Sequence, residues 1–264
     1  MNRIILMVLR LLVHVPGWFY KICKMAGDTE DKIYDAQERY RFLQRLTQRA
    51  NRAGRIHIEC YGHENLPEKD GFVVFPNHQG LFDGLIFLET LDRPFSIVMK
   101  KEVENVILIR QVREIIHGKL MDREDIRQSM GVIREMSREV KEGRNYIIFA
   151  EGTRSRNGNE LLEFKGGAFK SATNAHCPIV PAAIIDSYKA FDTNSIKPLT
   201  VQVHYLKPIE YEEYKGMRSH EIALMVQERI RSAIRQAQGG SGAEYGAVSR
   251  DGAGPDDGGG GNDV

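Results

Sequence analysis

The sequence has 264 residues, of which 42% are hydrophobic and 28% are charged, which is enough apolar material for one large core. Its 37 basic and 36 acidic residues give a formal net charge of +1, and this balance argues against a nucleic-acid-binding protein with a dense basic face. The three cysteines are far apart and form no C-x-x-C pair, which argues against zinc ribbons and redox motifs and suits a reducing compartment.

The first predicted element is an amphipathic helix over residues 1–25, with an interruption at Pro16-Gly17. The apolar run Ile4–Val13 is shorter than the ~20 residues of a spanning helix, and no small-x-small cleavage site follows it as in a secretory signal. On a helix the polar residues share one stripe, and they are Arg3, Arg10, His14 and Lys21. We therefore interpret the segment as a helix lying in, or dipping into, one membrane leaflet, with a packed core helix as the alternative.

A second amphipathic helix is predicted over residues 28–53. Apolar side chains recur there at helical spacing, and Gly54 follows where a helix commonly ends in glycine. The two helices together predict a membrane-associating N-terminal segment over residues 1–54.

The middle of the chain alternates predicted strands with predicted helices. The predicted strands are 56–60, 72–75, 95–99, 146–149, 179–185 and 200–206, and the predicted helices are 124–142 and a last one capped by Ser219. This alternation predicts an α/β domain over residues 55–237, with a mixed, largely parallel β-sheet flanked by helices. Residues 238–264 are rich in Gly and Asp without periodicity, so we predict that they are disordered.

The most informative polar loop follows the predicted strand 72–75. His78 and Asp83 are five residues apart, so they would not share a helix face, but they can meet in a tight loop that enters a helix. A carboxylate that accepts one imidazole N–H fixes the tautomer and leaves the other nitrogen as a general base. For an isolated pair at this spacing, the better interpretation would be that His78 caps the helix and Asp83 pairs elsewhere.

The strand that precedes Glu151 also ends in a charged loop. Gly152 lets the backbone approach a ligand closely, and Arg154 offers a planar fork suited to phosphate. Glu151 would either hold that arginine or bind a hydroxyl. Arg123 is a second candidate phosphate ligand, and Lys165 adds a cation in a glycine-rich setting, although each alone equally fits a surface turn.

In their order, these segments resemble the blocks of the glycerolipid acyltransferase family, whose best-known members are 1-acyl-glycerol-3-phosphate acyltransferases. The first block, Asn-His-x-x-x-x-Asp, is matched at Asn77, His78 and Asp83; the second, ending in Asp-Arg, at Gly118, Asp122 and Arg123; the third, Phe-Pro-Glu-Gly-Thr-Arg-Ser, at Phe149 and 151–155; and the fourth, an apolar block around a proline, at 178–181. The sequence departs from the pattern at Gly80, where Ser is frequent, at Ala150, where Pro is usual, and at Lys119, which is not typical.

The resemblance implies an O-acyltransferase that moves a fatty acyl chain from acyl-CoA or acyl-carrier protein to the hydroxyl of 1-acyl-glycerol-3-phosphate, giving phosphatidic acid in phospholipid synthesis. It makes His78 and Asp83 catalytic. The substrate-binding residues would be Arg123, Glu151, Gly152, Thr153, Arg154 and Lys165.

The expected partners are the acyl donor, lysophosphatidate and membrane lipid, without nucleic acid and without a metal or other cofactor. A soluble thioester donor places the membrane-associated enzyme on the cytoplasmic face. The alternatives are acylation of glycerol 3-phosphate or another lysophospholipid, a lipid hydrolase that uses the same pair to activate water, and a non-catalytic membrane-binding homologue.

Overall fold

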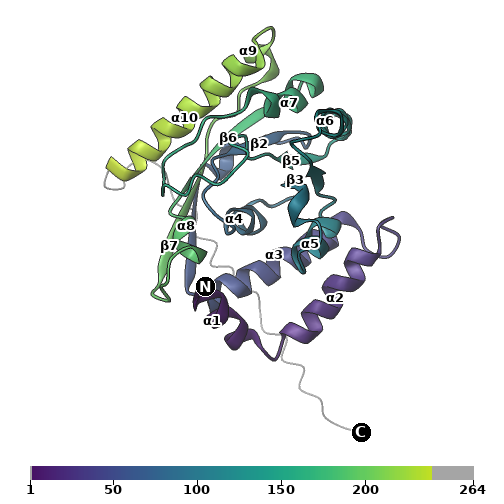
Figure 1. Cartoon of the computed structure of the whole chain (residues 1–264), viewed down its shortest axis with the longest axis vertical. Helices are drawn as coiled ribbons and strands as arrows, with labels where there is room; N and C mark the ends of the chain where they lie inside the picture. The colour runs from purple at the N-terminus through teal and green to yellow at the C-terminus, as the bar shows by residue number, and fades with distance from the viewer. Residues whose placement is uncertain (1, 240–264) are drawn as a thin grey trace.

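The computed structural model describes residues 2–239 (Figure 1). Residues 1 and 240–264 lie outside the described residues, and with them most of the segment predicted to be disordered. Within residues 2–239 the strands are β1 (Ile56–Tyr61), β2 (Val73–Pro76), β3 (Phe95–Lys100), β4 (Lys119–Met121), β5 (Asn145–Ile147), β6 (Ile179–Ile185) and β7 (Leu199–Tyr205).

These strands form one sheet in the order β1-β7-β6-β2-β5-β3-β4. The paired strands run parallel except β6 and β7, which are antiparallel. The predicted mixed, largely parallel sheet is confirmed. Strand β4 was not predicted, because three half-buried residues at a sheet edge carry too short a pattern to recognise.

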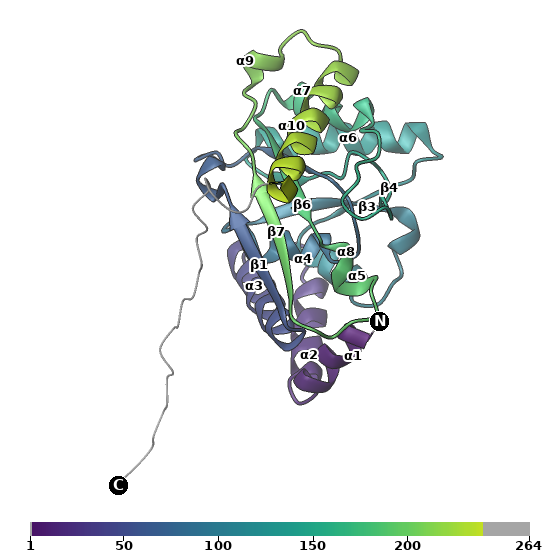
Figure 2. The same ribbon diagram turned by 90° about the vertical axis from the view of Figure 1, so that its left-hand side faces the viewer.

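Helices cover both faces of the sheet (Figures 1 and 2). They are α1 (Asn2–Leu11), α2 (Val15–Gly27), α3 (Ala36–Ala53), α4 (Asp83–Thr90), α5 (Ile109–Ile115), α6 (Ile126–Lys141), α7 (Lys170–Ala175), α8 (Tyr188–Phe191), α9 (Tyr211–Tyr214) and α10 (Ser219–Gly239). Alternate residues of β2 feed two separate hydrophobic clusters: Val74 packs with α3, α4 and α5, whereas Val73 and Phe75 pack with α6, α7 and α10. Helix α10 ends two residues beyond the predicted domain boundary at 237.

Helix α3 begins at Ala36 and not at residue 28 as predicted. Asp35 caps it, because its Oδ1 accepts a hydrogen bond from the Glu38 amide at 2.7 Å. Before it, the Asp28 carboxylate accepts hydrogen bonds from three successive backbone amides of residues 32–34 and holds a turn. The polar groups of this turn compete successfully with a longer helix.

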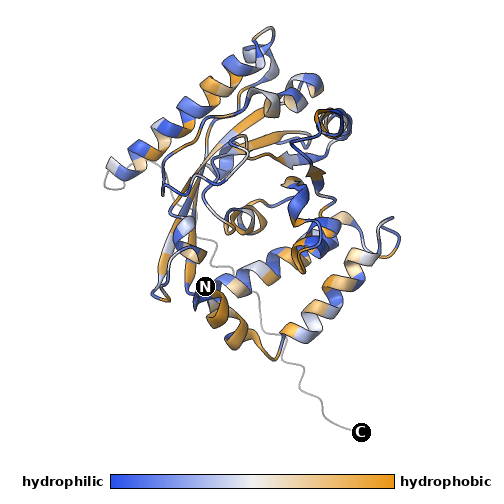
Figure 3. Cartoon of the chain, in the orientation of Figure 1, coloured by the Kyte–Doolittle hydropathy of each residue, from blue (hydrophilic) through white to orange (hydrophobic). Residues whose placement is uncertain are grey.

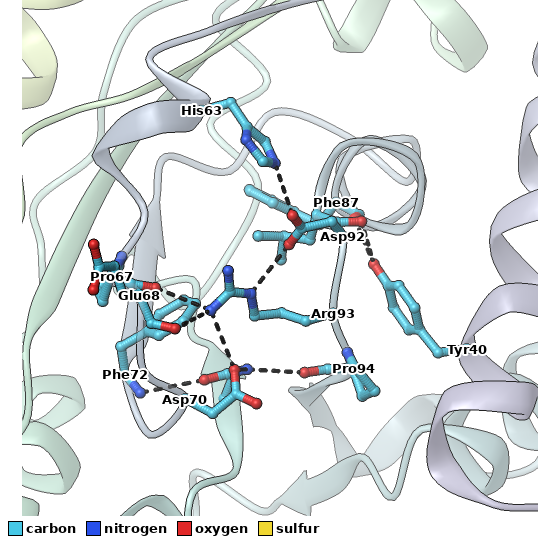
Figure 4. A network of polar contacts seen from close by, with 12 residues as sticks. Tyr40, His63, Pro67, Glu68, Asp70, Phe72, Phe87, Asp92, Arg93 and Pro94 are labelled. Atoms are coloured by element: carbon cyan, nitrogen blue, oxygen red, sulfur yellow. Dashed lines mark hydrogen bonds and ion pairs between the residues drawn. The ribbon is translucent and has the colours of Figure 1, made fainter. Parts of the chain in front are cut away.

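The amino ends of β2, β3 and β5 are joined by a polar network around Arg93 (Figure 4). The Arg93 guanidinium donates to the Pro67 carbonyl at 3.0 Å and contacts Asp70 at 3.4 Å. Asn145 donates to Asp70 at 2.9 Å and to the Pro94 carbonyl at 3.1 Å. The network satisfies polar groups at the strand starts, which is the edge of the sheet opposite the site described below.

Helices α1 and α2 meet at a bend of 97°. The predicted interruption at Pro16-Gly17 is wrong: the break lies at residues 12–14, and Pro16 stands in the first turn of α2, where a missing N–H costs no hydrogen bond. Among the described residues no single helix is long and apolar enough to cross a membrane, and the bent pair passes that test only when its two helices are taken together.

Helix α1 is largely apolar (Figure 3), and its two arginines bind other parts of the protein while apolar side chains remain exposed. Arg3 is buried and donates to the carbonyls of Gly54 at 2.6 Å and Lys197 at 2.9 Å, while Arg10 donates to Ala53 at 3.0 Å. These arginines stabilise the carboxyl end of α3, where the helix dipole favours cations. The outward residues of α1 and of the turn that follows it are Ile4, Ile5, Val8, Leu9, Leu12 and Val13, whose exposed fractions run from 39% to 91%.

Candidate active site

The candidate site lies at the carboxyl edge of the parallel strands. Strand β2 pairs in parallel with β5 on one side and with β6 on the other, so the segments that follow these three strands emerge together. This edge is where ligands bind in open α/β sheets. The loop after β2 carries His78, and α4 begins at Asp83.

His78 and Asp83 are in direct contact. The imidazole Nδ1 lies 2.7 Å from Oδ2 of Asp83, and the Asp83 side chain is fully buried. The same Oδ2 accepts hydrogen bonds from the backbone amides of Gln79 at 2.7 Å and Gly80 at 3.0 Å. The loop therefore folds around this carboxylate, which holds the ring in the tautomer that carries its proton on Nδ1.

The second nitrogen of His78 points away from this pair. The ring stacks on Phe149, with centroids 4.2 Å apart, and 22% of the His78 side chain is exposed. Within residues 2–239 nothing forms a hydrogen bond with Nε2. This nitrogen is accessible and unprotonated in the tautomer that Asp83 imposes, which is the arrangement of a general base.

Ser187 joins His78 and Asp83 in one hydrogen-bonded group, and the sequence did not indicate this role. Its hydroxyl donates to Oδ1 of Asp83, and the serine is fully buried. It follows β6, and its own amide donates to the Gln79 side chain at 2.9 Å. The only signal in the sequence was its place just after a buried strand. That β6 lies beside β2 is set by the tertiary structure and cannot be read from the sequence.

Asn77 fixes the position from which the loop departs. Its side chain donates to the Ile184 carbonyl at 2.9 Å and accepts from the Ile184 amide at 2.7 Å. Gln79 donates to the same carbonyl at 2.9 Å. These buried contacts make the loop rigid on both sides of His78 and preset the geometry of the imidazole.

Glu151 supports the His78 loop and does not hold Arg154. The buried carboxylate accepts hydrogen bonds from the amides of His78 at 2.9 Å and Leu162 at 3.2 Å. Burial raises the pKa of Glu151 to about 7, and the negative charge of Asp83 adds to the rise, while the two amides oppose it. Of the two roles that the sequence allowed for Glu151, pairing with the arginine is replaced by these backbone contacts.

Arg123 reaches the loop that contains Gly152. A side chain added at Gly152 would place its first carbon 3.3 Å from the Arg123 guanidinium, and Gly152 has a left-handed backbone with φ of +75°. Burial lowers the pKa of Arg123, and Glu102 opposes that shift. The glycine thus makes room beside the guanidinium of Arg123, which is an exposed residue overall and carries its charge.

The other predicted binding residues are less closely grouped. Arg154 Nη1 lies 4.0 Å from Asp192, with 29% of its side chain exposed. Thr153 is exposed and makes no side-chain hydrogen bond within the described residues. Lys165 is 62% exposed, and its ammonium lies 3.5 Å from Glu163. The structure brings Arg123 to the Gly152 loop, but it leaves Lys165 without a contact to the His78 loop.

The model of the acyltransferase family matches residues 57–185, which include His78, Asp83 and the loop with Gly152. Residues 57–185 therefore form a domain of the acyltransferase family. Family relatives include 1-acyl-sn-glycerol-3-phosphate acyltransferases of Borreliella burgdorferi, 31% identical over 60% of this chain and 66% of the relative, and of Escherichia coli, 29% identical over 64% and 69%. A coconut relative, from Cocos nucifera, is 29% identical over 57% of this chain and 49% of its own.

The crystal structure of another family member has the same fold. It is the 1-acyl-sn-glycerophosphate acyltransferase PlsC of Thermotoga maritima, which superposes with a TM-score of 0.73 over 92% of this chain and 99% of its own. Its sequence identity is 19%, so the likeness concerns the fold. The alignments with the curated relatives span from 49% to 69% of the relatives' own length.

Proposed function

We propose that the protein is an O-acyltransferase that moves a fatty acyl chain from a thioester donor to the free hydroxyl of 1-acyl-glycerol-3-phosphate, giving phosphatidic acid. The observation that carries this proposal is the contact of 2.7 Å between His78 and Asp83, with Nε2 open to a ligand. The names of the relatives in bacteria and plants support the same reaction.

The proposed chemistry is a direct acyl transfer with one proton relay. His78 Nε2 takes the proton of the acceptor hydroxyl while the oxygen attacks the thioester carbonyl, and Asp83 stabilises the imidazolium that forms. The C–S bond then breaks, and the departing sulfur takes the proton back from Nε2. General-base action of this kind contributes ~10²–10⁴-fold, and positioning and oxyanion stabilisation supply the rest.

The acceptor phosphate would be bound by two arginines on neighbouring loops. Arg123 lies against Gly152, and Arg154 lies two residues after Gly152 in the same loop. Guanidinium groups bind phosphate with two parallel hydrogen bonds, which positions the acceptor as well as attracting it. Gly152 supports this by leaving space, and Glu151 acts through the His78 amide; Thr153 and Lys165 remain predictions from the family resemblance.

The outward apolar side of α1 supports association with a membrane. Burying a leucine-sized side chain in an apolar phase stabilises by about 1.5–3 kcal/mol, and six such residues face outward together. The lipid acceptor and product would then stay in the bilayer while the soluble donor arrives from the cytoplasm. We therefore place the enzyme at the cytoplasmic face, with acyl-CoA or acyl-carrier protein as the donor.

The exposed apolar side of α1 and the His78–Asp83 pair favour the proposed acyl transfer to a lysophospholipid over the alternative functions. A soluble acceptor such as glycerol 3-phosphate gives no reason for an exposed apolar helix, whereas a lysophospholipid does. A non-catalytic homologue has no use for a buried Asp83 that orients an accessible histidine. A lipid hydrolase would share the pair and differ only in the attacking group.

An acyl-transfer assay with several acceptors tests the proposal. The purified protein is given palmitoyl-CoA or palmitoyl-acyl-carrier protein together with lysophosphatidate, glycerol 3-phosphate or lysophosphatidylcholine. We expect phosphatidate to form fastest by at least tenfold. Free fatty acid without any acceptor would identify a hydrolase, and no acyl product from either donor would refute the proposal.

A further inference from the structure

A pocket of about 240 Å³ opens between α6 and the segment that leads into α7. The residues that line it and that matter here are Arg123, Ile126, Met130, Arg134, Gly167 and Lys170. We refer to it as the α6–α7 pocket. It has no role in the mechanism above except that Arg123 lies at its boundary.

The α6–α7 pocket is strongly biased toward positive charge. Its lining includes three cations, Arg123, Arg134 and Lys170, and no Asp or Glu. None of the three forms an ion pair or a side-chain hydrogen bond within residues 2–239, although the chain as a whole has nearly equal numbers of basic and acidic residues. Glu102 acts on Arg123 from outside the pocket lining, but clustered cations that form no ion pair still attract a ligand that carries several negative charges.

The apolar part of the pocket is exposed. Ile126 is 73% exposed and Met130 is 50% exposed, and they lie one turn apart on the same side of α6. An apolar surface between cations suits a ligand that combines phosphates with a planar or hydrophobic group. A ligand consisting of phosphate alone would leave this surface in water.

The position of the pocket links it to the candidate active site. Arg123 joins them, because it lines the pocket and also packs against Gly152, whose amide bonds to the carbonyl of Phe149 beneath the His78 ring. Figures 1 and 2 show α6 and α7 toward the end of the molecule opposite α1 and α2. The elements that line the pocket therefore lie far from the apolar helix that we assign to the membrane.

We propose that the α6–α7 pocket binds the phosphate-bearing nucleotide of an acyl-CoA donor. This inference rests on the proposed acyl transfer and adds the donor and its site. The phosphates lie against Arg134 and Lys170, the adenine ring covers Ile126 and Met130, and the pantetheine arm passes Arg123 and Gly152 toward His78. An acidic carrier protein would also complement the cations, but a concave pocket of about 240 Å³ suits part of a small ligand better than the surface of a protein.

The test is the charge reversal Arg134→Glu/Lys170→Glu, compared with Arg127→Glu. Arg127 is an exposed cation on the same helix that does not line the pocket, so its reversal controls for a general loss of positive charge. In the double variant, two side chains that would attract the phosphates of CoA are replaced by side chains that repel them. We expect the KM for palmitoyl-CoA to rise by ~10-fold or more, with kcat and the KM for lysophosphatidate within about twofold of wild type.

Two further measurements make the result specific. S-palmitoyl-pantetheine lacks the nucleotide and its phosphates, so its KM should be the same in the double variant and in the wild type. Free CoA should bind the double variant about tenfold more weakly by calorimetry, while Arg127→Glu binds it normally. Thermal unfolding of all three proteins checks that each is folded.

The possible failures are distinguishable. If the wild type transfers acyl groups but the double variant keeps its KM for palmitoyl-CoA, or loses affinity only for lysophosphatidate or acyl-carrier protein, the inference is wrong and the proposed function stands. If the wild type transfers no acyl group, the proposed function fails. Unchanged CoA binding by the double variant would then also overturn the pocket assignment.

Discussion

At the residue scale, the side chain of Asp83 satisfies several donors at once. One oxygen accepts from the His78 ring and from two backbone amides, and the other accepts from Ser187. These hydrogen bonds hold the buried carboxylate in one position, which is what the orientation of an adjacent imidazole requires. The same contacts make Asp83 structural, so its removal would change the fold of the loop as well as its chemistry.

Ser187 offers a cleaner test of this arrangement than Asp83. Ser187→Ala leaves one buried carboxylate oxygen without its donor, which should cost about 1–3 kcal/mol in the free energy of unfolding and lower kcat. Ser137→Ala removes another buried hydroxyl, one that bonds only to the Ile133 carbonyl on α6, and should lower stability alone. Urea unfolding and kcat are measured for both; an unchanged kcat in Ser187→Ala would show that Ser187 does not support the pair.

Glu151 should make stability depend on pH. Its pKa rises from 4.5 to about 7 on folding, so between these pH values the native state binds more protons than the unfolded state and stability falls as pH rises. Glu151→Gln removes this contribution. From pH 5 to pH 8 the wild type should lose at most about 3 kcal/mol more than the variant in urea unfolding; parallel profiles would contradict the raised pKa.

Arg154 should act on acceptor binding. Arg154→Ala removes one phosphate contact and should raise the KM for lysophosphatidate by ~10-fold with little change in kcat. Arg156→Ala, an exposed arginine in the same loop, is the matched control and should leave both constants unchanged. Steady-state kinetics with varied acceptor measure the effect, and a loss confined to kcat would assign Arg154 to the chemical step instead.

At the element scale, α1 is an amphipathic helix with the reverse of the usual orientation. Its arginines bind the carbonyls at the end of α3, and its apolar side faces outward. The packing of Arg3 explains this orientation, because a buried guanidinium with two carbonyl partners holds the helix in one rotation. Only the outward face remains for a membrane.

Charges on that face should weaken membrane binding. Leu9→Asp/Val13→Asp replaces two exposed apolar side chains, 65% and 91% exposed, and should lower the fraction of protein that sediments with anionic vesicles by tenfold or more. Leu224→Asp on α10, at a 49% exposed position, is the control and should sediment like wild type. Equal sedimentation of all three proteins would assign membrane contact to another surface.

At the scale of the whole molecule, the positions of the buried strands in the sequence were predictable, but the order in which they lie side by side in the sheet was not. Val73 and Phe75 are recognisable as strand residues from a short apolar run, because burial on both faces requires one. The placement of Ser187 beside Asp83 depends on β6 lying next to β2, and the two strands are about a hundred residues apart in sequence. The His78–Asp83 contact was foreseeable because it is local.

The α6–α7 pocket could not be predicted for the same reason. Nothing in the sequence distinguishes Arg134 and Lys170 from other basic residues, and only the packing of α6 on α7 brings them to one pocket. The resulting molecule has an apolar helix at one end, a cationic pocket toward the other, and α4, which begins at Asp83, between them (Figures 1 and 2). This order suits a lipid acceptor and a soluble donor that meet at His78.

The most direct test of the account is the rate of acyl transfer in His78→Ala. With palmitoyl-CoA and lysophosphatidate, kcat/KM should fall by ~10²–10⁴-fold because the general base is absent, while thermal unfolding and vesicle sedimentation match wild type. His57→Ala, an exposed histidine on β1, should be fully active. Wild-type activity in His78→Ala would contradict the central claim that His78 carries the proton.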